Sequence, residues 1–391
     1  MMRMQTIYRC LVLLVFIICL TGCWDSIEME DRAFVMASGF DLTEDGQVEA
    51  TLQIALPTGL SIAMQGGGAT KEPFVVVTDK GREGTDILQH LQEMISRRVF
   101  LGHRGVIIFG EAYAREGIDE ILDTFLRSPE SRYTTFILTA KGVTAKEILN
   151  TPHQFLEEIP ALGLKKKQQI GISLAVKLNE FLDAIASDGK SPMTGVIQVL
   201  EKKADQKIFK LGEAAVYQDN KLVGFLPEEE MKTLFMLRGE AENQNLTAQV
   251  KPIEEGFKGT MGVRVLRSKS TIDIQIKDEI PEIMITLEAR VVVLENDSKL
   301  DLSKEKKLKE AESKFNEQVD QRFVSMLEHI QKEFKADVFG FGNEVHIKHP
   351  EYWKMNKDKW KKIYPKIPIS TRVDITIIGI GRAQAPPHLE K

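Results

Sequence analysis

The three cysteines of this chain, Cys10, Cys19 and Cys23, all lie within its first 23 residues. Because none follows, neither an internal disulfide nor a cysteine-based zinc site can stabilise the chain beyond them. The chain has 391 residues, of which 43% are hydrophobic, and this is enough to build apolar cores. We therefore expect a fold that hydrophobic cores stabilise without covalent cross-links.

A targeting segment leads up to the last of these cysteines. Arg3 and Arg9 come first, and an unbroken apolar run of ten residues, LVLLVFIICL, occupies 11–20. This run is too short to cross a hydrocarbon core of about 30 Å, which needs about 20 residues. A basic start followed by a short apolar run is typical of a signal peptide. We expect residues 1–22 to be a lipoprotein signal peptide.

The sequence Leu20-Thr21-Gly22-Cys23 has the pattern of a bacterial lipobox. Small residues let a signal peptidase reach the bond between Gly22 and Cys23. The Cys23 thiolate is the nucleophile that accepts a diacylglyceryl group, and N-acylation adds a further chain. Two or more chains anchor a protein stably, whereas one chain is marginal. The alternative is an uncleaved membrane anchor, or a buried helix, that carries a cysteine by chance.

Charge argues against one class of partner. Lysine and arginine number 52, aspartate and glutamate 57, and the formal net charge is −5. This balance gives no basis for nucleic-acid binding. No apolar stretch after Cys23 approaches the length of a transmembrane helix, so we expect that part to be soluble.

The first half of the chain alternates between strand and helix patterns. Buried strands are expected at 74–79, 104–110 and 132–142, and amphipathic helices at 84–98, 117–130 and 173–187. This alternation predicts an α/β layer built on a mixed sheet. We assign residues 23–200 to an N-terminal α/β domain, ended by the polar stretch at 201–207.

The second half reads as α+β. Residues 201–265 form a small middle α+β domain in this interpretation, and residues 266–391 a C-terminal α+β domain. Polar and apolar residues alternate over 259–278 and 282–296, which predicts an antiparallel pair with one wet face. An apolar stripe over 303–335 predicts a long helix packed on this antiparallel sheet. The fold class is therefore α/β and α+β, with three domains of mixed sheets flanked by helices.

Catalytic and metal-binding patterns are not found. Of seven histidines, only His346 and His349 are close in sequence. They lack the glutamate spacing of a zinc protease helix, and we expect a loop or a strand there and no metal. No nucleophile elbow or phosphate-binding loop is present. We expect no enzymatic activity and no cofactor other than the covalent lipid at Cys23.

Two segments leave alternatives open. In LGHRG, at 101–105, His103 and Arg104 lie between glycines and could contact a ligand or form a turn before a buried strand. In WKMNKDKWKK, at 353–362, two tryptophans lie among lysines. That segment could touch anionic lipid headgroups, or its tryptophans could cover the core of a solvated helix.

Four blocks resemble one known family, the Ger(x)C lipoproteins, which are the C subunits of GerA-type spore germinant receptors. These blocks are CWDSIEMEDRAFVMASGFD (23–41), FLGHRGVIIFGEAYAREGIDEILDTFLRSPESR (100–132), GEAAVYQDNKLVGFL (212–226) and DVFGFGNEVHIKHPEYW (337–353). They occur in order from the lipobox cysteine onward, and the resemblance they mark runs along nearly the whole chain. The resemblance implies a fold of three α/β-type domains.

The resemblance also implies a function. By this resemblance, the chain would be a non-enzymatic subunit, lipid-anchored on the outer face of the spore inner membrane. Its partners are an A-type and a B-type polytopic subunit, in a complex that senses nutrients such as amino acids or sugars. Only Cys23, the lipid acceptor, carries over as a residue with assigned chemistry.

Two other functions remain as alternatives, an extracytoplasmic solute-binding lipoprotein of a transporter and an anchored hydrolase. The first predicts two similar lobes, and the second predicts a catalytic constellation. Within the receptor interpretation, the segment DSIEMEDR at 25–32 lies nearest the anchor. Asp25 and Arg32 are therefore candidate contacts with the polytopic subunits.

Overall fold

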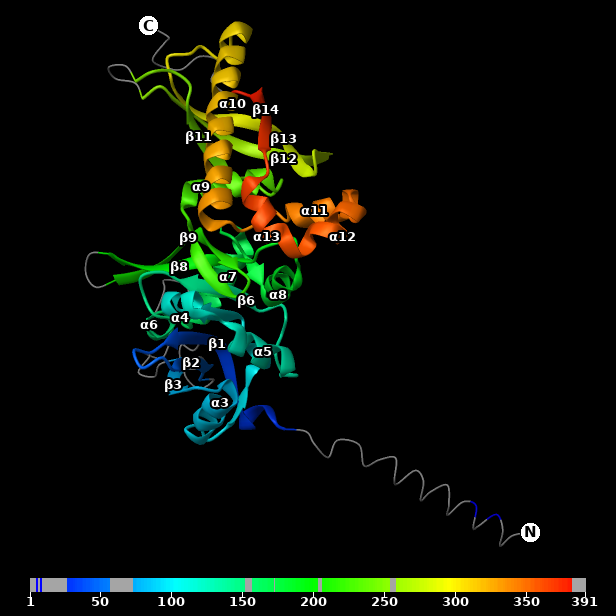
Figure 1. Ribbon diagram of the computed structural model, residues 1–391. Helices are drawn as coiled ribbons and strands as arrows, with labels where there is room; N and C mark the ends of the chain where they lie inside the picture. The colour runs from blue at the N-terminus through cyan, green and yellow to red at the C-terminus, as the bar shows by residue number, and fades with distance from the viewer. Residues whose placement is uncertain are drawn as a thin grey trace.

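The molecule is built on two sheets that follow one another along its long axis (Figure 1). The computed structural model describes Gln5, Tyr8 and residues 27–56, 73–151, 157–171, 173–202, 206–253 and 258–381. The larger sheet belongs to the first half of the chain. The smaller sheet belongs to the second half and carries the longest described helix. This arrangement confirms the expected α/β and α+β class.

The larger sheet is mixed, as the alternating pattern predicts. Its strand order is β10-β9-β8-β6-β5-β1-β2-β3, with β4 beside β1 and β7 beside β6. The pairs β1–β5, β5–β6 and β6–β8 are parallel because helices connect these strands. The strands are β1 (Arg32–Leu42), β2 (Val48–Ala55), β3 (Phe74–Gly81), β4 (Arg98–Phe100), β5 (Val106–Phe109), β6 (Phe136–Ala140), β7 (Val176–Lys177), β8 (Met193–Lys202), β9 (Gln206–Gln218) and β10 (Lys221–Leu226).

Helices cover both faces of this sheet. One apolar cluster joins the sheet to α3, α4, α5 and α8, and a second joins it to α6 and α7. The central strand β5 is buried at every position, as expected for a strand covered on both sides. The helices are α3 (Gly84–Glu93), α4 (Glu111–Glu116), α5 (Asp119–Arg127), α6 (Ala145–Asn150), α7 (Pro160–Ile170) and α8 (Leu178–Ala186).

The smaller sheet has the order β11-β12-β13-β14. Its first three strands are antiparallel, whereas β14 pairs with β13 in parallel because α10 forms the crossover between them. The strands are β11 (Asn245–Gln249), β12 (Thr260–Lys277), β13 (Ile280–Asp297) and β14 (Ile369–Gly379). The helices of this half are α9 (Glu228–Leu237), α10 (Glu305–Glu328), α11 (Phe341–Lys348), α12 (Pro350–Asn356) and α13 (Trp360–Ile363).

Helix α10 packs on this sheet and also protects its edge. Phe315, Val319 and Phe323 of its apolar stripe are buried in the core. On the same helix, Asn316 both donates to and accepts from the backbone of Ile375, at 3.2 and 2.7 Å. These bonds satisfy backbone groups of the edge strand β14 that would otherwise be free to pair with another chain.

The expected domain boundaries fall where strands pair. The boundary at 200/201 lies at the end of β8, and β8 pairs antiparallel with β9 from Met193 to Lys202. The boundary at 265/266 lies inside β12. The division into three domains stays a prediction. The strands from 206 to 226, assigned to the middle domain, are part of the larger sheet.

A close junction joins the two halves. The backbone N–H of Ser191 donates to the carbonyl of Asp337 at 2.8 Å. Gly189 and Gly342 lie back to back, and a Cβ at Gly342 would stand 2.4 Å from the Cα of Gly189. The Asp337 side chain is buried and accepts from the N–H groups of Phe341 and Gly342 at 3.0 and 2.8 Å. Its burial raises its pKa to about 6.

Candidate partner-binding surfaces

Among the strands, the start of β1 lies nearest in sequence to Cys23, the expected lipid acceptor. Gly22, Cys23 and Asp25 lie outside the described residues, so their predicted roles stay predictions. Arg32 opens β1 and is nine residues from Cys23. A segment of that length reaches at most about 30 Å. An anchor at Cys23 would therefore hold this end of the larger sheet close to the membrane.

Arg32 lies over an aromatic cluster. Its guanidinium carbon is 4.5 Å from the ring centroid of Phe100. The Phe100 ring makes edge contacts with Phe34 and His103, at centroid distances of 5.8 and 5.7 Å. Arg32 has no ion pair with another described residue, and nearby Met29 is 76% exposed. A half-buried cation beside an exposed apolar side chain suits a protein partner that offers both negative charge and apolar surface.

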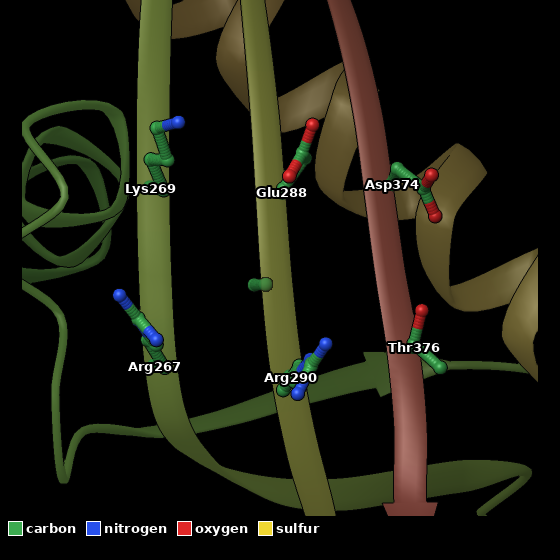
Figure 2. Close-up of a pocket in the computed structure, with 7 residues that line it drawn as sticks. Arg267, Lys269, Glu288, Arg290, Asp374 and Thr376 are labelled. Atoms are coloured by element: carbon green, nitrogen blue, oxygen red, sulfur yellow. The ribbon is translucent and has the colours of Figure 1, made fainter.

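A second surface is the solvent-facing side of the smaller sheet, opposite its core. We call it the charged sheet face; Figure 2 shows its residues projecting from three adjacent strands. They surround a shallow depression of about 260 Å³. The polar members are Arg267 and Lys269 on β12, Glu288 and Arg290 on β13, and Asp374 and Thr376 on β14.

The charges on this face are not paired within the described chain. Arg267 lies directly opposite Arg290 and Glu288 lies beside Asp374, whereas Lys269 lies opposite Glu288 and has the opposite charge. Like charges at such positions are unfavourable. On α10, by contrast, ion pairs are common, including Lys309 with Glu305 at 2.6 Å. A face with unpaired, clustered charge is suited to a partner of complementary charge.

The sequence signal for this face was present but incomplete. Alternation over 259–278 and 282–296 predicts a wet face, and the burial patterns of β12 and β13 confirm it. Alternation does not show which polar residues stand opposite one another. That depends on register, which only the paired strands reveal.

The tryptophans of the 353–362 segment belong to the core. Trp353 and Trp360 are 5% and 2% exposed, which confirms that they cover a core and do not face lipid. His346 lies on α11, not in a loop or a strand as expected, and His349 is the residue between α11 and α12. His346 stacks on Trp353 and His349 contacts the carbonyl of Ile274 at 3.1 Å, so both have structural partners. Gly342, inside α11, and Pro350, which begins α12, are residues that usually interrupt helices, so the sequence pattern does not predict a helix here.

Within the described ranges, no three His, Cys, Asp or Glu side chains lie close enough together to hold a metal ion. None of the described helices is both long and apolar enough to cross a membrane.

These features define a two-sheet α/β and α+β protein with charged and aromatic contact surfaces. Residues 25–199 match the spore germination protein N-terminal domain, and residues 212–381 match the spore germination B3/GerAC-like C-terminal domain. The chain therefore belongs to the GerAC-like, or Ger(x)C, family of spore germination proteins, as its sequence blocks indicated.

Relatives and a solved structure agree with this membership. The chain is 25% identical to spore germination protein KC of Bacillus subtilis (strain 168), over 97% of both chains. It is 23% identical to spore germination protein B3 of the same organism, over 97% of this chain and 99% of that one. The crystal structure of the GerBC protein matches 88% of this chain and 98% of its own, with a TM-score of 0.57 and 20% identity. This likeness shows that the fold is shared.

Proposed function

We propose that the chain is a lipid-anchored, non-enzymatic subunit of a spore nutrient germinant receptor. It assembles with polytopic A-type and B-type subunits on the outer face of the spore inner membrane. Family membership over both halves of the chain is the observation that carries this proposal. The lipobox at 20–23 supports the anchor, since the thiol of Cys23 stands where a diacylglyceryl group is attached.

The two surfaces support a role in assembly. Arg32 and its aromatic cluster lie at the end of the molecule that an anchor would hold near the membrane, where polytopic partners expose their loops. The charged sheet face lies in the other half and offers charge for which the described residues form no ion pair. The two halves differ in fold, so the molecule lacks the two similar lobes expected of a solute-binding lipoprotein.

The experiment is Cys23→Ala in a sporulating host, with Cys19→Ala as the matched control. Membrane fractionation and nutrient-triggered germination are scored together. Cys23→Ala should release the protein from the membrane and abolish or strongly reduce germination, while Cys19→Ala, inside the signal peptide, should change neither. Loss of attachment with normal germination would overturn the proposal, and impaired uptake of a solute would favour the transporter-linked alternative.

A further inference from the structure

An arginine is buried without a carboxylate partner beneath helices α3 and α5. Arg104, between the turn at 101–103 and β5, is 3% exposed. Its Nη1 and Nη2 donate only long hydrogen bonds of 3.4 Å, to the hydroxyls of Ser38 and Ser131. Its Nε has no partner within the described chain. A buried cation with only two long hydrogen bonds and no counterion is unfavourable, so a bound anion would stabilise this site.

This guanidinium lines a cavity. The cavity lies between strands β1 and β2 and helices α3 and α5, and its volume is about 60 Å³. The ring of Phe125 forms one wall, with its centroid 4.4 Å from the guanidinium carbon. Leu52, Ile87 and Leu91 are further apolar wall residues. Burial lowers the pKa of Arg104 to about 10, so the group remains a cation at neutral pH.

The lining selects a chemical class of ligand. A planar carboxylate matches the forked donors of a guanidinium, and the serine hydroxyls can donate to it as well. The apolar walls suit a hydrocarbon tail and disfavour a strongly hydrated dianion such as phosphate. No carboxylate of the described chain lines the cavity, so an ammonium group would have no ionic partner. The volume accommodates about four to six water-sized groups.

We propose that this cavity binds a small monocarboxylate, with its carboxylate on Arg104 and a tail of about two to four carbons against Phe125 and the α3 side chains. The proposal does not depend on the germination role. For the segment 101–105, sequence alone left either a ligand contact or a turn. Under this proposal Arg104 is the ligand contact, and His103 belongs to the aromatic cluster with Phe34 and Phe100.

The test uses the full chain purified in detergent micelles. Radiolabelled butyrate is measured by equilibrium dialysis at constant pH and ionic strength, and thermal unfolding is followed with acetate, propionate and butyrate. Wild type should bind butyrate saturably, at about one per chain, with a melting temperature raised by about 2 °C or more. Propylamine, alanine, chloride and phosphate should give no such shift.

Three variants decide the outcome. Arg104→Met removes the cation, Ala50→Val fills the cavity and leaves the cation, and Arg127→Met is the control on the exposed side of α5. Binding that is lost in the first two and kept in the third supports the proposal. If Arg104→Met does not fold, Ala50→Val alone is decisive. Binding retained in Ala50→Val would overturn the proposal, as would no binding by wild type, in which case water alone fills the cavity.

Discussion

The indole Nε1 of Trp360 donates a hydrogen bond of 3.0 Å to Oδ2 of Asp337, and both side chains are buried. This bond ties α13 to the segment that begins α11. The same carboxylate caps the N–H groups of Phe341 and Gly342, so one buried group organises the junction between the two halves. Burial raises its pKa from the ordinary 3.8 to about 6, against the opposing effect of these donors.

The raised pKa of Asp337 predicts a pH-dependent stability. Between about pH 4 and pH 6 the folded state retains a proton that the unfolded state has lost. The contribution of this group is therefore fully present below pH 4 and is lost as the pH rises through 6. The advantage of wild type over Asp337→Asn should fall by about 2–3 kcal/mol across this range, at about 1.4 kcal/mol per pKa unit.

Urea unfolding of both proteins at a series of pH values measures this difference. Trp360→Phe removes a donor that favours the carboxylate, so it should move the transition to higher pH. A wild-type advantage that is constant from pH 4 to pH 7 would contradict the assignment.

The paired glycines at the junction predict a steric effect. Gly342→Ala should destabilise the protein by about 1–3 kcal/mol, because the added Cβ would stand 2.4 Å from the Cα of Gly189. Gly163→Ala is the matched control. It lies in α7, where the nearest atom to an added Cβ is 3.5 Å away, and there it should be neutral or slightly stabilising. Thermal unfolding of the two variants compares them directly, and equal melting temperatures would refute the close contact.

A buried hydroxyl network predicts a smaller effect in the larger sheet. The Tyr217 hydroxyl lies 2.6 Å from Oγ1 of Thr139, which is also 2.6 Å from Oγ1 of Thr194. Tyr217→Phe should cost about 1 kcal/mol, since Thr139 keeps one partner. The exposed control Tyr133→Phe should change stability by less than about 0.5 kcal/mol. Chemical denaturation separates these values, and a neutral Tyr217→Phe would show that the network adds no net stability.

Local patterns predicted the elements of this fold better than their pairing. The alternation of Ile272, Ile274 and Ile276 gave the strand β12, because one buried face leaves a period of two in the sequence. The parallel pairing of β14 with β13 was not predictable, since it joins strands separated by a long helix. The polar stretch at 201–207 suggested a linker, yet β8 and β9 on either side of it pair with each other. Composition cannot tell a linker from a connection between adjacent strands.

The candidate sites divide in the same way. The proposed lipid acceptor Cys23 rests on a local motif, and its chemistry would need no tertiary context. The burial of Arg104 depends on Ser38 and Ser131, which are 66 and 27 residues away in sequence, so the sequence could only leave a turn and a ligand contact as alternatives. The charged sheet face depends on the register of three strands and could not be assembled from alternation alone.

The position of Arg32 at the start of β1, near the proposed anchor, predicts a loss of assembly without a loss of folding. Arg32→Glu reverses the charge over Phe100 and should reduce recovery of the A-type and B-type subunits with the tagged chain by at least about tenfold, as expected for a central interface cation. Arg127→Glu, on an exposed face of α5, is the control and should leave recovery unchanged. Affinity purification from detergent-solubilised spore membranes measures both. Equal recovery would remove Arg32 from the interface.

The charged sheet face predicts an electrostatic contact that salt weakens. Arg290→Glu should lower co-purification of the partner subunits, and the difference from wild type should shrink as ionic strength rises, because exposed charges are screened within about 10 Å at 0.1 M salt. Arg290→Glu replaces a like charge opposite Arg267 with an opposite one, so the isolated chain should keep its stability or gain up to about 1 kcal/mol. Lys309→Glu on α10, away from this face, is the control and should not affect assembly. If Arg290→Glu and Lys309→Glu assemble equally well at low salt, the charged sheet face is a solvated surface and the partners bind elsewhere.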